Sequence, residues 1–239
     1  MENDIYLWLV TFMALALVCF VFCFMYIQVR MRDLEQKKTA YQSILNQSLE
    51  TFARAIDAKD RDTNGHSIRV ANYSREIARR MNLNEAEQEE LYYAAMLHDI
   101  GKIGIPDSIL KKPGKLNEEE IKIIRNHTSI GGEILQDFTA IQGISDGARY
   151  HHERYDGKGY NEGLKGEQIP LFARIICVAD SYDTMSSKRV YKELHDEEYI
   201  LNELQQCSGK QFDPDIVPYM IDMIQDGTAK LQGMIDVEM

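Results

Sequence analysis

The sequence predicts an all-α protein in which one N-terminal transmembrane helix and a linker helix precede a helical bundle. Three observations predict this class: a long apolar segment near the N-terminus, apolar residues at helical spacing through most of the remaining chain, and no segment that alternates between apolar and polar residues. We expect a short exterior segment over residues 1–4, the transmembrane helix over 5–28, the linker helix over 29–48, the bundle over 49–230 and a tail over 231–239.

The transmembrane prediction depends on the segment from Ile5 to Ile27, which contains no charged residue. A helix of this length spans about 30 Å, the thickness of the hydrocarbon core of a bilayer. A cleaved signal peptide is the alternative, but it would have a basic start and small residues at a cleavage site. The start is acidic here, with Glu2 and Asp4, so the sequence favours an uncleaved anchor.

Basic residues directly after the apolar segment predict its orientation. They are Arg30, Arg32, Lys37 and Lys38. Because positively charged flanks stay on the cytoplasmic side, we expect a single-pass protein of the cell membrane with its N-terminus outside and its bundle in the cytoplasm. With residues 1–4 alone outside, we expect no extracytoplasmic sensor in this chain.

The predicted linker helix carries an apolar stripe. Its members recur at helical spacing between charged residues and are Leu34, Tyr41, Leu45, Leu49, Phe52 and Ile56. The stripe has two interpretations that the sequence leaves open. It pairs with a second copy to form a homodimer, or it packs on the domain that follows.

Helix starts can be placed within the bundle. Asn84 with Glu87, and Asn117 with Glu120, have the spacing of a capping box, in which each residue binds the backbone N–H of the other. Glycines and prolines predict ordered loops over residues 101–115 and 153–170. The apolar run over 171–185 resembles a strand in its β-branched content, but its length favours a buried helix.

The net charge of the chain is −11, with 27 basic and 38 acidic residues. This charge argues against a nucleic-acid polymer as partner, because such proteins carry a basic surface that displaces counterions. A small anionic substrate stays compatible with the charge when bound metal ions supply positive charge locally.

Five of the six histidines lie in short motifs that also contain acids or glycines. Imidazole and carboxylate together are typical ligands of iron, manganese and zinc. The candidate ligands number seven: His66, His98, Asp99, His127, His151, His152 and Asp180. One ion rarely takes more than six ligands, so the set predicts two divalent ions, iron or manganese ahead of zinc, with Asp99 between them. Such a pair activates water for phosphoryl transfer, which predicts a metal-dependent phosphohydrolase.

Several motifs resemble the HD-GYP family, the cyclic-di-GMP phosphodiesterase branch of the HD superfamily of metal phosphohydrolases. They run in order from about residue 50 to 220 and include HSIRVANYS, AAMLHDIGKIGIPDSILKKPGK, NHTSIGGEIL, HHERYDGKGY and ARIICVADSYDTMSSKRVY. The resemblance implies an HD-type helical bundle that hydrolyses cyclic-di-GMP to pGpG, and onward to GMP in some members.

The resemblance also implies roles for individual residues. One metal would be held by His66, His98, Asp99 and Asp180, and the other by Asp99, His127, His151 and His152. Asp62 stands where some members hold a third ion, usually with glutamate. Lys102 would act in catalysis beside Asp99, through a phosphate or the leaving oxygen. Substrate contacts would come from Tyr160, Asp183, Arg189 and Lys192.

The chain departs from the family pattern at one position. The Gly-Tyr-Pro of the family is Gly159-Tyr160-Asn161 here. Since proline restricts φ, asparagine predicts a looser loop and an altered substrate preference. Two alternative functions follow: a phosphohydrolase of another cyclic dinucleotide or nucleotide, and a non-hydrolysing module that binds a cyclic dinucleotide and signals through the linker. The complete ligand set favours an enzyme over the module.

Overall fold

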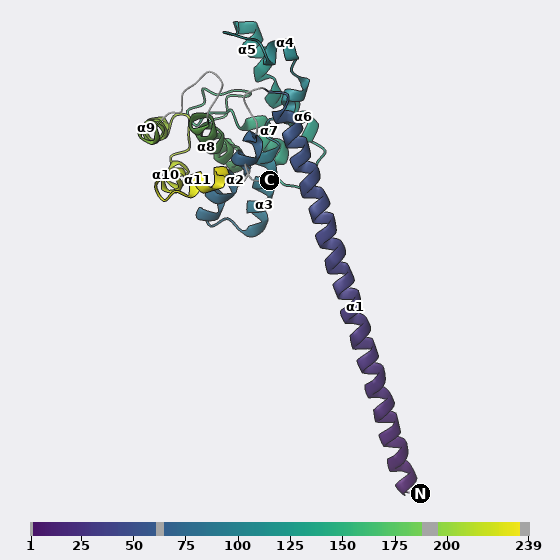
Figure 1. Ribbon diagram of the computed structural model, residues 1–239. Coiled ribbons are helices and arrows are strands. Elements are labelled where there is room, and N and C mark those ends of the chain that lie inside the picture. The colour runs from purple at the N-terminus through teal and green to yellow at the C-terminus, as the bar shows by residue number, and fades with distance from the viewer. Residues whose placement is uncertain (1, 61–64, 188–195, 235–239) are drawn as a thin grey trace. The chain divides into compact units, whose positions relative to one another are not determined.

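The computed structural model describes residues 2–60, 65–187 and 196–234. In these ranges every regular element is a helix (Figure 1), and the one isolated β-bridge joins Ser208 and Phe212. The all-α prediction is confirmed. The chain divides into two compact units, residues 1–48 and residues 49–239.

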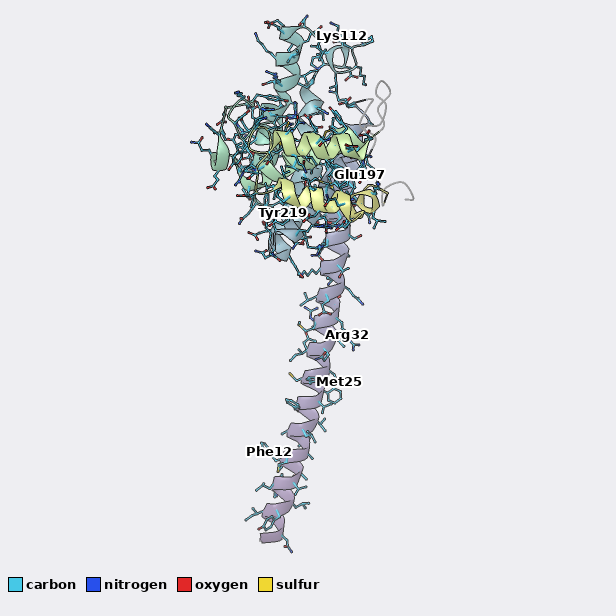
Figure 2. All side chains as sticks on the ribbon, turned by 90° about the vertical axis from the view of Figure 1, so that its left-hand side faces the viewer. Phe12, Met25, Arg32, Lys112, Glu197 and Tyr219 are labelled. Atoms are coloured by element: carbon cyan, nitrogen blue, oxygen red, sulfur yellow. The ribbon has the colours of Figure 1, made fainter. Side chains whose placement is uncertain are left out.

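Helix α1 (Glu2–Asp57) is continuous through the predicted transmembrane and linker segments. Its apolar side chains project into the surroundings in the first unit, as Figure 2 shows for Phe12 and Met25, which are 73% and 57% exposed. The most apolar stretch of α1 has a mean hydropathy of 2.7 and no buried residue. A helix of this length and composition is long and apolar enough to cross a membrane.

The last turns of α1 belong to the second unit and pack on it. Leu49, Ala53 and Ile56 are buried there, at 5%, 0% and 7% exposure. Of the predicted apolar stripe, Phe52 is exposed, and so are the more N-terminal members of the stripe in the first unit. Packing on the second unit therefore buries only two members of that stripe, Leu49 and Ile56.

The second unit contains short helices joined by loops. Their bounds are α2 (His66–Arg80), α3 (Glu85–Met96), η1 (Ile100–Gly104), α4 (Asp107–Leu110), α5 (Glu118–Arg125), α6 (His127–Leu135), α7 (Ile144–Tyr150), η2 (Gly166–Gln168), α8 (Leu171–Ser186), α9 (Glu197–Cys207), α10 (Val217–Gln225) and α11 (Thr228–Met234). Helix α11 thus extends into the residues that we predicted as a tail. Helices α4 and α5 project from the rest of this unit (Figures 1 and 2).

The core lies where α2, α3, α7 and α8 pack on one another. These helices contribute Ile77, Leu91, Ile144, Ile175 and Ile176, whose side chains are almost completely buried. Each such side chain stabilises the fold by about 1.5–3 kcal/mol relative to an exposed one. The segment over 171–185 is part of α8, so its prediction as a buried helix is confirmed.

Both predicted capping boxes are present and begin α3 and α5. The Asn84 side chain accepts from the Glu87 N–H at 3.0 Å, and the Glu87 carboxylate accepts from the Asn84 N–H at 2.9 Å. The stretch over 101–115 is more regular than predicted, because it contains most of η1 and the single turn of α4.

A close backbone approach joins η1 to α6. A Cβ atom on Gly101 would lie 1.8 Å from the carbonyl oxygen of His127 and 2.5 Å from the N atom of Gly131. Only glycine fits at this contact. The approach brings the residues around Asp99 next to the start of α6, where His127 lies.

Candidate metal centre

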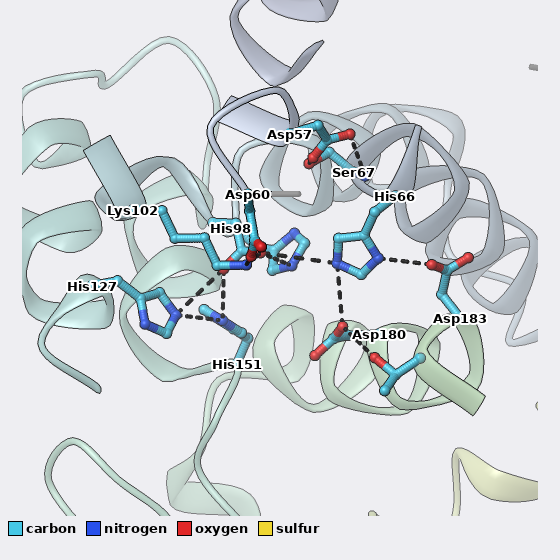
Figure 3. A network of polar contacts seen from close by, with 12 residues as sticks. Asp57, Asp60, His66, Ser67, His98, Lys102, His127, His151, Asp180 and Asp183 are labelled. Atoms are coloured by element: carbon cyan, nitrogen blue, oxygen red, sulfur yellow. Dashed lines mark hydrogen bonds and ion pairs between the residues drawn. The ribbon is translucent and has the colours of Figure 1, made fainter. Parts of the chain in front are cut away.

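The seven predicted ligands meet inside the second unit although they come from separate elements. Figure 3 labels five of them: His66, His98, His127, His151 and Asp180. Most of them lie at helix ends, where a side chain can point past the helix into the space beyond. His66 begins α2, His98 and Asp99 follow α3, His127 begins α6, His151 and His152 follow α7, and Asp180 lies within α8.

These residues form two groups with ligand atoms within 4.8 Å of one another. The first group is His66, His98 and Asp180, and the second is His127, His151 and His152. A third such group contains Asp99 together with His98 and His151, one residue from each of the other two. The arrangement therefore brings Asp99 next to both groups.

The two carboxylate oxygens of Asp99 face different groups. Oδ2 lies 3.5 Å from His98 Nε2 and 3.9 Å from His66 Nε2. Oδ1 lies 3.4 Å from His127 Nε2 and 4.0 Å from His151 Nε2. A carboxylate in this position can contribute one oxygen to each of two cations.

Backbone carbonyls determine which ring nitrogen faces the centre. The Nδ1 atoms of His98, His127 and His151 lie 2.7–3.0 Å from the carbonyl oxygens of Ala95, Ile124 and Gly147, in that order. Since a carbonyl only accepts, each Nδ1 carries the hydrogen and donates it. Each Nε2 in the neutral ring then presents a lone pair to the centre, which is the state that a metal ion binds.

The contact between the His127 and His151 rings indicates a cation site. His127 Nε2 and His151 Nε2 are 3.4 Å apart. Burial, together with the neighbouring His152 and His98, lowers the pKa of His151 well below its ordinary value, so its ring is neutral. Burial likewise lowers the pKa of His152 to about 4. Two facing lone pairs cannot hydrogen-bond to each other, and a bound cation would satisfy both. The donor set fits divalent metals.

Lys102 supplies positive charge beside Asp99. Its Nζ donates to Asp99 Oδ2 at 2.7 Å and to Asp60 Oδ2 at 2.9 Å (Figure 3). Burial by itself would raise the pKa of Asp99, but the Lys102 ammonium beside it lowers that pKa well below the ordinary value. Asp99 is therefore ionised, the state in which a carboxylate can bind a cation.

The structure gives Asp183 hydrogen-bond partners that the sequence did not indicate. This carboxylate is 1% exposed and lies behind His66, where Oδ2 accepts from His66 Nδ1 at 2.8 Å. Arg69 donates to both of its oxygens, at 2.7 and 2.9 Å. Burial opposes ionisation, but these hydrogen bonds lower the pKa of Asp183 to about 2. These hydrogen bonds orient the His66 ring, and a contact of Asp183 with the nucleotide stays a prediction.

Hydrogen bonds hold the loop at Asn161, where the sequence predicts a looser loop. The Asn161 side-chain amide donates to Ser129 Oγ of α6. At the base of the loop the buried Glu153 Oε1 accepts from the backbone N–H groups of Glu162 and Gly163, at 2.7 and 2.9 Å. These bonds fasten the loop at two points, although it lacks the family proline.

Tyr160, a predicted substrate contact, lies at the rim of the centre beside His152. Its ring centroid is 4.9 Å from that of His152, with a 32° angle between the rings. The predicted contacts Arg189 and Lys192, and the predicted third-site ligand Asp62, lie outside the described residues.

Sequence reasoning missed Asp60, Arg69 and Glu153. Arg69 follows His66 by three residues on one helix, so their shared face was a usable signal. Glu153 directly follows the histidine pair and precedes a glycine-rich loop, which is a weaker signal. No local pattern pointed to Asp60, because it reaches Lys102 only through the folding of the chain.

Comparisons with known proteins agree with this geometry. The family model described as HD domain matches residues 50–216. A cyclic di-GMP phosphodiesterase of Thermotoga maritima is 42% identical over 185 residues, which cover 77% of this chain and 50% of that protein. The 3'3'-cGAMP-specific phosphodiesterase 2 of Vibrio cholerae is 40% identical, over 72% of this chain and 33% of that protein. The chain thus spans half or less of these curated relatives.

A solved structure shows the same fold. The crystal structure of a cyclic GMP-AMP-specific phosphodiesterase from V. cholerae aligns with a TM-score of 0.61 at 21% identity, covering 80% of this chain and 50% of that one. The family match covers most of the second unit and includes every residue of the centre. The chain belongs to the HD domain family, in its HD-GYP branch.

Proposed function

We propose that this protein is a metal-dependent phosphodiesterase that hydrolyses cyclic-di-GMP to pGpG and onward to GMP. The observation that carries the proposal is the position of Asp99, whose two oxygens face two separate groups of inward-turned Nε2 atoms. The relatives named above act on cyclic dinucleotides, which supports this substrate class.

In the proposed centre one ion is held by His66, His98, Asp99 and Asp180, and the other by Asp99, His127, His151 and His152. Iron or manganese is the proposed metal, with a third ion if Asp62 contributes. When bound, such ions activate a water molecule and stabilise the charge of the phosphoryl group.

The residues of the chain supply orientation and charge in the proposed reaction. Water adds to one phosphorus, the P–O bond to a ribose oxygen breaks, and that leaving oxygen takes up the proton that water gives up. Lys102 lies beside Asp99, where its ammonium can contact the reacting phosphate and protonate the leaving oxygen. Asp183 and Arg69 hold His66 in place, and Tyr160 borders the substrate together with Arg189 and Lys192.

A second candidate function changes only the substrate. One relative is named for cyclic di-GMP and another for 3'3'-cGAMP, at 42% and 40% identity. The residues of the centre bind phosphate and metal rather than bases, so they favour neither dinucleotide. The loop bond between Asn161 and Ser129 replaces the family proline next to Tyr160, and substrate preference is the property it would alter.

The test combines metal content with turnover. The full chain would be purified anaerobically in detergent and offered cyclic-di-GMP, 3'3'-cGAMP, cyclic-di-AMP and pGpG. We expect at least two iron or manganese ions per chain and hydrolysis of at least one cyclic dinucleotide. Full metal content with binding but no hydrolysis would support the non-hydrolysing module instead. One ion or none would contradict the two-metal centre.

We also propose that α1 anchors the protein with its second unit in the cytoplasm. A reporter that is active only in the cytoplasm, fused after Met239, should therefore be active. Replacing Arg30, Arg32, Lys37 and Lys38 by glutamine should lower that activity, because these basic residues determine the orientation. An inactive reporter on the native chain, or release of a processed soluble form, would contradict the proposal.

A further inference from the structure

Arg125 connects the rim of the metal centre to the surface. It is the last residue of α5, and its guanidinium carbon lies 4.9 Å from the ring centroid of Tyr160. The Tyr160 ring in turn lies 4.9 Å from the ring of His152, one of the proposed ligands. Arg125, Tyr160 and His152 thus form a row that runs outward from the centre.

The charge of Arg125 differs from that of the cations inside the centre. Lys102 is paired with Asp99 and Asp60, and Arg69 is paired with Asp183. Arg125 is exposed, and no carboxylate within residues 2–60, 65–187 and 196–234 forms an ion pair with it. The Arg125 guanidinium can therefore bind an anion, although the net charge of the whole chain is −11.

Hydrogen bonds hold the backbone at Arg125 and the loop next to Tyr160. The buried Thr128 donates its hydroxyl to the carbonyl of Arg125 at 2.9 Å, which secures the turn between α5 and α6. The loop with Tyr160 is fastened to α6 through Asn161 and Ser129. Side chains that are positioned before substrate arrives lose less entropy on binding.

We propose that Arg125 binds the non-reacting phosphate of the cyclic dinucleotide, with Tyr160 holding the guanidinium in position. This inference rests on the proposed function. A cyclic dinucleotide carries two phosphodiesters, so the one that is not cleaved extends away from the metal centre. The planar guanidinium can bind phosphate oxygens in pairs while its flat side rests on an aromatic ring.

The test compares two substrates of different size. Bis(p-nitrophenyl) phosphate contains a single phosphodiester, which occupies the reacting position. Arg125→Ala should reduce kcat/KM at least about tenfold more for cyclic-di-GMP than for this small diester, the scale of a lost hydrogen bond to a charged group. For cyclic-di-GMP the loss should be in KM more than in kcat. Arg125→Lys, which keeps the charge, should recover part of the loss.

A matched control separates a direct contact from a general field effect. Lys122 lies on the same helix, is exposed, and pairs with Glu119 at 2.9 Å. Lys122→Ala removes the same charge from α5 and should change KM less than twofold, the expectation for a remote exposed charge. Equal effects of the Arg125 and Lys122 substitutions would overturn the proposal, as would equal losses on both substrates.

Binding separates this inference from the proposed function. The affinity of the metal-loaded full chain for a phosphorothioate analogue of cyclic-di-GMP, measured by calorimetry, needs no turnover. Arg125→Ala should weaken that affinity on the order of tenfold even if the native chain hydrolyses nothing. Unchanged affinity would refute the role of Arg125 while leaving the phosphodiesterase proposal intact.

Discussion

Asp99→Ala is expected to abolish phosphodiesterase activity, with a loss of at least about 10³-fold in kcat. The substitution removes both oxygens that face the two histidine groups, so neither group keeps its shared ligand. Metal content should fall below two ions per chain in the same preparation. Elemental analysis and turnover of cyclic-di-GMP, measured together, check both effects.

The helical fold should survive this substitution. Lys102 would keep its bond to Asp60 at 2.9 Å, so its buried ammonium would not be left without a carboxylate. Circular dichroism should therefore show nearly native helix content. Asp99→Asn is the matched control, because it keeps the shape of the side chain and removes its charge. Near-native rates in either variant would show that Asp99 does not bridge two ions.

Asp183→Asn should lower both metal affinity and kcat, by roughly 10–100-fold, the usual effect of removing a partner that orients a metal ligand. An amide has one acceptor oxygen, whereas the carboxylate accepts from His66 and twice from Arg69. The ring of His66 would lose its fixed orientation, or the guanidinium of Arg69 would lose its paired contact. Metal titration and turnover measure the two effects.

The choice of substrate decides between the two roles considered for Asp183. An orienting residue affects every substrate, so bis(p-nitrophenyl) phosphate and cyclic-di-GMP should lose activity equally. A nucleotide contact would instead raise KM for cyclic-di-GMP alone and leave metal affinity unchanged. Asp213→Asn provides the control, because Asp213 is also buried and paired with an arginine, Arg174. It should lower stability and leave metal affinity as it is.

Much of the fold could be predicted because its signals are local. A capping box needs only residues three apart, and Asn84 with Glu87 forms the predicted bonds. The helical spacing of apolar residues and the uncharged run in α1 likewise act over one or a few turns. The candidate metal ligands could also be recognised from local signals, because His98 and Asp99 are adjacent in the sequence, and so are His151 and His152.

The hydrogen bonds of Asp183 and Asn161 could not be predicted, since each joins a partner far along the chain. Asp183 is hydrogen-bonded to His66, which is 117 positions away in the sequence, and Asn161 is hydrogen-bonded to Ser129, which is 32 positions away. A carboxylate in a motif has the same local sequence whether it faces a substrate or supports a histidine. Only the path of the chain determines which donor fills its lone pairs.

The sequence by itself determined the helical class, the apolar N-terminal segment and the kinds of side chain that converge on the centre. The tertiary structure decided how they converge: Gly101 lets η1 approach α6, and Asp99 then lies between two groups of histidines. Helices follow from hydrogen bonds within a few residues, so sequence patterns report them. The centre follows from the packing of separate helices, which brings together side chains that no local pattern connects.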